Sequence, residues 1–114
     1  MTAEKAAQIS GFLGLCTRAG QLVFGQDACV NAVRKRQAAL VLLDEGCSEN
    51  TRKRFLDACR THETPLYGVK EDMIDRAVGK EGRKVAAIKR GGMGEKMLLL
   101  FGKQPCLYEN RSDT

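Results

Sequence analysis

The sequence has few aromatic residues and no long apolar run. Its 114 residues include no Trp, two Pro and one His, and aromatic residues make up 5% of the chain. No apolar run approaches the roughly 20 residues of a membrane-spanning helix, and the amino end has no sustained apolar segment like that of a secretory signal. We therefore expect a soluble cytoplasmic protein with no membrane partner.

Cysteine and histidine are also placed unfavourably for disulfide, metal or catalytic chemistry. The five cysteines leave one unpaired in any disulfide scheme, and none forms a C-x-x-C pair. We interpret them as small core residues in a reducing compartment. With His62 the only histidine, no zinc cluster or visible catalytic triad exists, and the glycines of residues 91–94 lack the Lys-Ser/Thr of a phosphate-binding loop. The sequence therefore predicts no cofactor, no metal and no enzyme activity.

The charge balance is moderately basic, with 19 Lys and Arg against 14 Asp and Glu, a net charge of +5. Clustered cations favour a polyanionic partner, because they release counterions when they neutralise phosphates. A solvated basic surface without a partner explains the same balance equally well.

Apolar spacing predicts alternating helices and strands, and hence an α/β fold with helices on both faces of a small sheet. Helices are expected over residues 3–18, 26–36, from Ser48 onward, 72–78 and 93–101, and strands over 22–24, 38–43, 65–69 and 85–88. Gly11 and Gly14 inside the first helix predict close packing against a neighbour. We expect one domain over residues 1–104 and a polar, mobile tail over 105–114.

Two segments are candidates for binding. A short strand ends at Gly25, and a helix begins at once with Gln26 and Asp27. The free amides and dipole of such a helix start suit phosphates or base edges, although a routine strand–helix turn explains it too. The second segment is the basic loop of residues 79–84. If it neighbours the helix start, the two form one basic edge, which the clusters at 34–36 and 52–54 would extend.

Four stretches in order carry a resemblance to a known family: residues 14–25, 39–45, 48–51 and 77–81. They are similar to the bacterial YlxQ-like branch of the L-seven-Ae ribosomal-protein family, whose better-known members bind kink-turn RNA. The resemblance covers about residues 9–101. It implies a three-layer α/β/α sandwich around a small four-stranded mixed sheet, in agreement with the apolar pattern.

The resemblance also implies an RNA-binding surface. In kink-turn binders the start of the second helix contacts tandem G·A pairs, and a loop before the last strand covers an unstacked nucleotide. Carried onto this chain, amides at the helix start approach the RNA, Asp27 and Asn31 contact base edges, and Arg34, Lys80 and Arg83 hold phosphates. The complete set expected to bind RNA is Gly25, Gln26, Asp27, Asn31, Arg34, Asp44, Glu45, Lys80, Glu81, Gly82 and Arg83.

Two positions depart from strong kink-turn binders, which usually have Glu or Gln in place of Ala28 and Lys in place of Asn31. One lost bidentate base contact removes about 1–3 kcal/mol of discrimination. We therefore expect relaxed, salt-sensitive binding of a structured RNA, either kink-turn-like or ribosomal. We also expect the protein to be a monomer and to have ribosome-associated proteins as further partners. The alternative is a protein-interaction adaptor that keeps the fold and binds RNA weakly or not at all.

Overall fold

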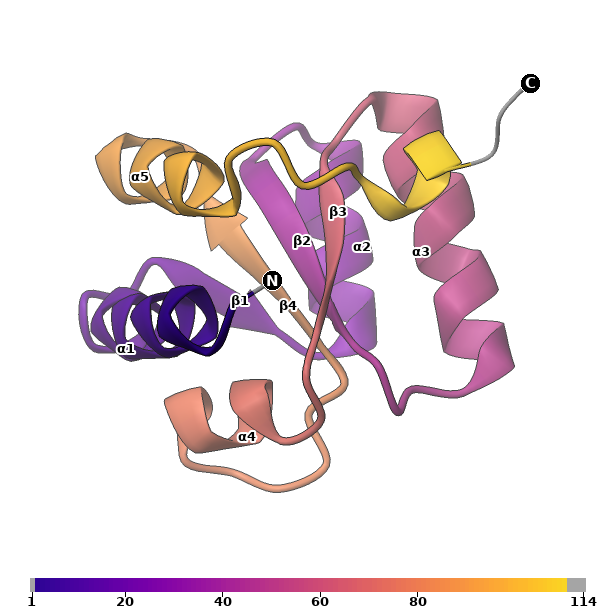
Figure 1. Ribbon diagram of the computed structural model, residues 1–114. Coiled ribbons are helices and arrows are strands. Elements are labelled where there is room, and N and C mark those ends of the chain that lie inside the picture. The colour runs from indigo at the N-terminus through magenta and orange to yellow at the C-terminus, as the bar shows by residue number, and fades with distance from the viewer. Residues whose placement is uncertain (1, 111–114) are drawn as a thin grey trace.

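The computed structural model describes residues 2–110 and contains helices and strands in alternation (Figure 1). The α-helices are α1 (Ala3–Arg18), α2 (Gln26–Arg34), α3 (Glu49–His62), α4 (Met73–Val78) and α5 (Gly92–Phe101). The strands are β1 (Leu22–Phe24), β2 (Ala38–Asp44), β3 (Leu66–Val69) and β4 (Val85–Lys89), and a short 3-10 helix, η1, spans Leu107–Asn110.

The strands form one mixed sheet in the order β1–β4–β2–β3. β4 is antiparallel to both β1 and β2, whereas β2 and β3 are parallel. The carboxyl ends of β1, β2 and β3 and the amino end of β4 therefore lie at one end of the sheet. The segments that follow or precede these strand ends are brought together in space, although they are far apart in the sequence.

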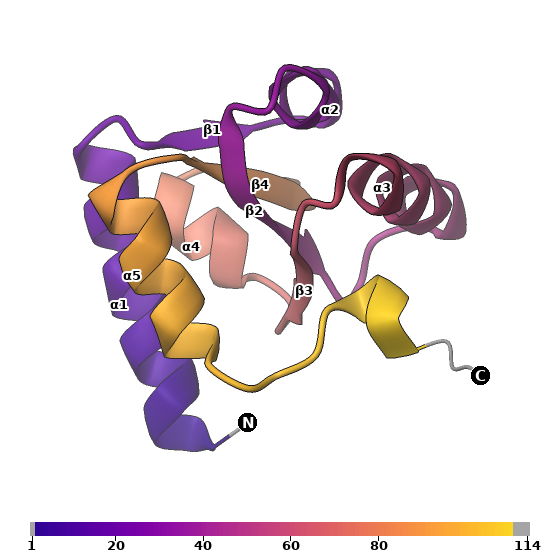
Figure 2. The ribbon, with the colours of Figure 1, turned by 90° about the horizontal axis from the view of Figure 1, so that it is seen from above.

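Helices cover both faces of the sheet, so the predicted three-layer α/β/α sandwich is confirmed (Figures 1 and 2). α1, α4 and α5 pack on one face, and α2 and α3 on the other. Strand β2 serves both layers because its side chains alternate: Leu40 and Leu42 face the first group, and Val41 and Leu43 face the second. All four are at most 1% exposed, as the continuous apolar run predicted.

Helix ends follow local chemistry. Ser48 caps α3, because its hydroxyl accepts a hydrogen bond from the amide of Thr51 at 3.2 Å. α2 ends at Arg34, two residues before the predicted end, because the backbone turns left-handed at Arg36 (φ 58°). The expected close packing at Gly11 is wrong: a Cβ there would meet no atom within 4 Å.

The carboxyl-terminal residues differ from the expected mobile tail. Cys106 is 6% exposed and joins the core beside α1, α4 and α5. η1 contacts both β3 and α3, and Leu107 packs into the core on the other face. The prediction is therefore wrong for Cys106, Leu107 and Tyr108, whose apolar side chains pack against the core; residues 111–114 lie outside the described part of the chain.

The cysteines are core residues, as predicted. All five are free thiols; Cys47 is half-buried and the other four are buried. Burial raises the pKa of both Cys29 and Cys59 to about 12. These two thiols therefore stay neutral and unreactive at physiological pH. Among residues 2–110, no helix has the length and apolar character to cross a membrane.

Candidate nucleic-acid interface

The sheet brings the two candidate binding segments together at one end. Phe24, the last residue of β1, pairs with Ala86 near the start of β4. β2 ends on the other side of β4, where the Asp44 amide donates to the Lys84 carbonyl at 2.9 Å. The start of α2, the turn after β2 and the loop before β4 are thus adjacent. We call these three segments, residues 24–31, 44–45 and 79–84, the strand-end surface.

The start of α2 presents free backbone amides. Gly25 precedes the helix with φ 96°, a conformation that side chains rarely adopt, and it supplies no side-chain cap. The first helical hydrogen bond runs from the amide of Cys29 to the carbonyl of Gly25 at 3.0 Å. The amides of Gln26, Asp27 and Ala28 remain available at the positive end of the helix dipole, which makes the helix start suitable for an anion.

Side chains of α3 hold this helix start in place. The Gln26 side-chain amide donates to the Thr51 hydroxyl at 3.0 Å and accepts from Arg54 at 3.2 Å. Arg54 also forms an ion pair with Asp27 at 2.9 Å. Asp27, one of the two side chains predicted to contact base edges, is therefore engaged within the protein, and so is the side chain of Gln26. Asn31 is exposed one turn after Asp27, and its side chain makes no hydrogen bond within residues 2–110.

The loop before β4 is held by a carboxylate of α4. Asp75 accepts hydrogen bonds from the amides of Gly82 and Arg83 at 3.1 and 2.7 Å. The loop then places two cations over the ring of Phe24, which is partly buried. The Arg83 guanidinium carbon lies 4.8 Å and the Lys80 ammonium 5.5 Å from the ring centroid, within the range of cation–π attraction. Within the described residues, neither side chain forms an ion pair or hydrogen bond.

Phe24 and Arg54 are site residues that the sequence prediction did not include. Phe24 was assigned only to a short strand, and its place beneath the loop depends on the pairing of β1 with β4. Arg54 was noted only as part of a basic cluster that would extend the edge. Its role in fixing the helix start depends on the packing of α3 beside α2.

Asp44 does not present its carboxylate on the strand-end surface, contrary to the expectation. Its side chain is fully buried, and its oxygens accept hydrogen bonds from the amides of Gly46 at 2.6 Å and Asp72 at 3.2 Å. Lys84 lies 3.9 Å from the same carboxylate. Asp44 therefore joins two turns of the backbone, and only the neighbouring Glu45 is exposed there.

Arg34 lies far from the start of α2, although it is only three residues after Asn31. It is the last residue of α2, eight residues after Gln26, which places it about 12 Å along the helix. Glu81 and Gly82 do lie on the strand-end surface, where the left-handed backbone of Gly82 (φ 79°) shapes the loop. In the part of the chain described, no cluster of three His, Cys, Asp or Glu residues could hold a metal ion.

Comparison with known proteins gives consistent results. The family model described as "Ribosomal protein L7Ae/L30e/S12e/Gadd45 family" matches residues 7–97. RNA-binding protein YlxQ of Bacillus subtilis (strain 168) is 37% identical over 90 residues, which cover 78% of this chain and 90% of the relative. RNA-binding protein YlxQ of Enterococcus faecium is 33% identical over 85 residues, which cover 74% and 82% of the two chains.

Two solved structures share the fold. A protein of unknown function from Bacillus halodurans C is 35% identical with a TM-score of 0.79, over 85% of this chain and 99% of the other. The Giardia lamblia 15.5kD RNA binding protein superposes with a TM-score of 0.74 over 90% and 89% of the two chains. Its identity is only 16%, so the likeness concerns the fold alone.

Proposed function

Because the chain belongs to the ribosomal protein L7Ae/L30e/S12e/Gadd45 family, we propose that it binds structured RNA, without catalysing a reaction, through the strand-end surface. The resemblance predicted from four sequence motifs is confirmed by the family match and by the two YlxQ relatives. Both relatives are named as RNA-binding proteins, which supports the same role for this chain.

One observation carries the proposal: free amides and free cations meet at one place. The unbonded amides of the first turn of α2 lie beside the Phe24 ring, over which Lys80 and Arg83 are held. Amides at a helix start bind phosphate oxygens, and the two cations add sequence-independent attraction to the RNA backbone.

The side chains of the surface favour contacts with the RNA backbone over base recognition. Gln26 and Asp27 are already bonded to Thr51 and Arg54, and Ala28 has no polar group. Asn31 is then the side chain left on this helix face to contact a base edge. We infer that binding is salt-sensitive and only moderately selective, with a kink-turn-like or ribosomal RNA as the partner.

The test is a fluorescence titration with a short kink-turn RNA and a matched duplex without the bulge, each at several salt concentrations. Each phosphate contact contributes roughly 0.7–0.9 to the slope of log affinity against log salt. Neutralising two contacts in the variant Lys80→Gln/Arg83→Gln therefore lowers the slope by about 1.4–1.8. A preference of the wild type for the kinked RNA supports the kink-turn assignment, and equal binding favours another structured RNA.

A matched control removes the same charge elsewhere. Lys96 and Lys103 are exposed on and just after α5, outside the three segments of the strand-end surface. The variant Lys96→Gln/Lys103→Gln has the same net charge as the loop variant and should keep nearly the wild-type slope. Equal effects of the two variants would mean that only net charge matters. No binding of the wild type to either RNA would contradict the proposal and favour a protein-interaction adaptor.

A further inference from the structure

A pocket lies at the opposite end of the sheet from the strand-end surface. It has a volume of about 480 Å³ and is found where β1 and β2 begin and β4 ends. Its volume lies within the range of roughly 300–1,000 Å³ typical of small-molecule sites. The floor of the pocket is apolar and is formed by Val23, Ala32, Ala38 and Ala87, whereas the side chain of Ile88, which also borders the pocket, packs on the other face of the sheet.

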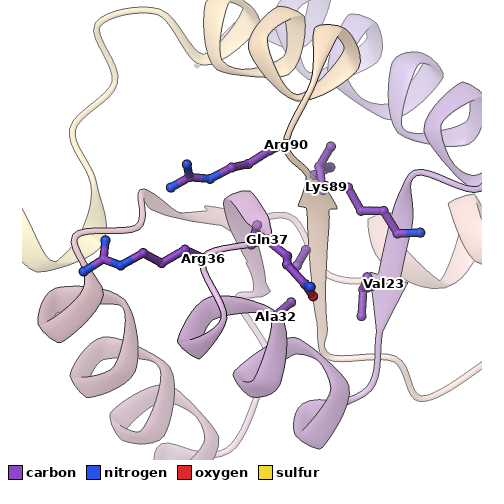
Figure 3. Close-up of a pocket in the computed structure, with 9 residues that line it drawn as sticks. Val23, Ala32, Arg36, Gln37, Lys89 and Arg90 are labelled. Atoms are coloured by element: carbon purple, nitrogen blue, oxygen red, sulfur yellow. The ribbon is translucent and has the colours of Figure 1, made fainter.

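The rim of this pocket is basic. Arg36, Lys89 and Arg90 line it together with the amide side chain of Gln37, and no acidic residue is among the lining residues. Arg36 and Arg90 extend in the same direction on one side, and Lys89 extends toward the other (Figure 3). All three cations are exposed, and their side chains make no ion pair or hydrogen bond within residues 2–110. Their charge is therefore available to a ligand.

The backbone at Arg36 is unfavourable for an arginine. Its φ is 58°, the left-handed conformation that follows many helix ends and that glycine adopts at the lowest cost. The amide of Gln37 donates to the carbonyl of Ala32 at 2.8 Å, so the turn is fixed by the end of α2. This turn at the end of α2 places Arg36 at the rim of the pocket.

We propose that this pocket binds one nucleotide unit, with the base on the apolar floor and the phosphate on the cationic rim. The Gln37 amide is placed to hydrogen-bond the edge of the base. This proposal rests on the proposed function, because the nucleotide would be an unstacked nucleotide of the same RNA that the strand-end surface binds. Lys89 is the fifth residue after Lys84 along β4, about 17 Å away, so the protein would hold one RNA at two points.

Nuclear magnetic resonance tests the pocket without any RNA. Amide resonances of the wild type are followed during titration with adenosine monophosphate, adenosine and inorganic phosphate in parallel. The proposal expects the nucleotide to shift residues 36–38 and 87–90, with smaller shifts from either component alone. It is overturned if these residues do not respond, or if phosphate alone gives the same shifts as the nucleotide.

Two variants test the rim. Arg36→Gly removes one cation and relieves the strained backbone, so it folds at least as stably as the wild type. Loss of one charge-assisted hydrogen bond weakens nucleotide binding by about tenfold. Lys89→Gln/Arg90→Gln has a larger effect, whereas the control Lys96→Gln/Lys103→Gln binds the nucleotide like the wild type. Equal nucleotide affinity in the rim and control variants would overturn the proposal.

The two proposals can fail separately. If the wild type binds no RNA but binds the nucleotide in this pocket, the proposed function fails and the pocket is a site for a free nucleotide. If RNA binding depends on Lys80 and Arg83 but not on Lys89 and Arg90, and the nucleotide shifts no pocket residue, the pocket proposal fails alone.

Discussion

The contact between α5 and the sheet depends on a glycine, and its replacement gives a quantitative prediction. A Cβ added at Gly94 would lie 2.6 Å from both the Ala39 Cβ and the Lys89 carbonyl oxygen. Ordinary non-bonded contacts of carbon are about 3.5–4.0 Å, so α5 has to move by about 1 Å. Such overpacking costs roughly 1–3 kcal/mol, partly offset by the better helix propensity of alanine, about 1 kcal/mol. Taking the middle of the overpacking range, about 2 kcal/mol, we expect Gly94→Ala to lower the free energy of unfolding by about 1 kcal/mol.

The assay is urea denaturation followed by circular dichroism, with Gly11→Ala as the control. Gly11 is an exposed helical glycine with open space around its Cβ position, so alanine there raises the free energy of unfolding by about 0.5–1 kcal/mol. The two identical substitutions therefore change stability in opposite directions. The reasoning is refuted if Gly94→Ala is as stable as the wild type, or if both variants shift the denaturation midpoint in the same direction.

Two further predictions concern Asp44 and the buried thiols. Asp44→Asn lowers the free energy of unfolding by about 1–3 kcal/mol in urea denaturation, because the charged acceptor of two backbone amides is lost. An unchanged stability together with a steeper salt dependence of RNA binding would contradict this structural role and would show that the carboxylate repels bound phosphate. The raised pKa values of Cys29 and Cys59 keep both thiols protonated in the folded state. Their stabilising effect is complete below the unfolded pKa of 9.0 and is lost as pH rises toward 12, by about 1.4 kcal/mol per pH unit and thiol. Urea denaturation at pH 8 and 10 checks this: the wild type should lose more stability than Cys29→Ala/Cys59→Ala, and equal losses would contradict it.

Much of the fold follows from local patterns in the sequence. The six apolar residues from Ala38 to Leu43 predicted a strand buried on both faces, and Ser48 predicted the start of α3. The tail prediction failed because it weighed the polar residues after Gln104 and overlooked the apolar side chains from Cys106 onward. Burial of that segment depends on the surface that β3 and α3 together provide.

The sequence by itself determined the order of helices and strands, the family, and the two segments that the proposed RNA-binding surface uses. These follow from short-range features: apolar spacing, glycines at turns, and motifs read in order along the chain. The tertiary structure alone decided that Asp44 is buried, that Phe24 lies beneath Lys80 and Arg83, and that free cations surround a pocket at the other end of the sheet. The physical reason is that strand pairing sets which distant residues become neighbours, and no local pattern encodes the order β1–β4–β2–β3.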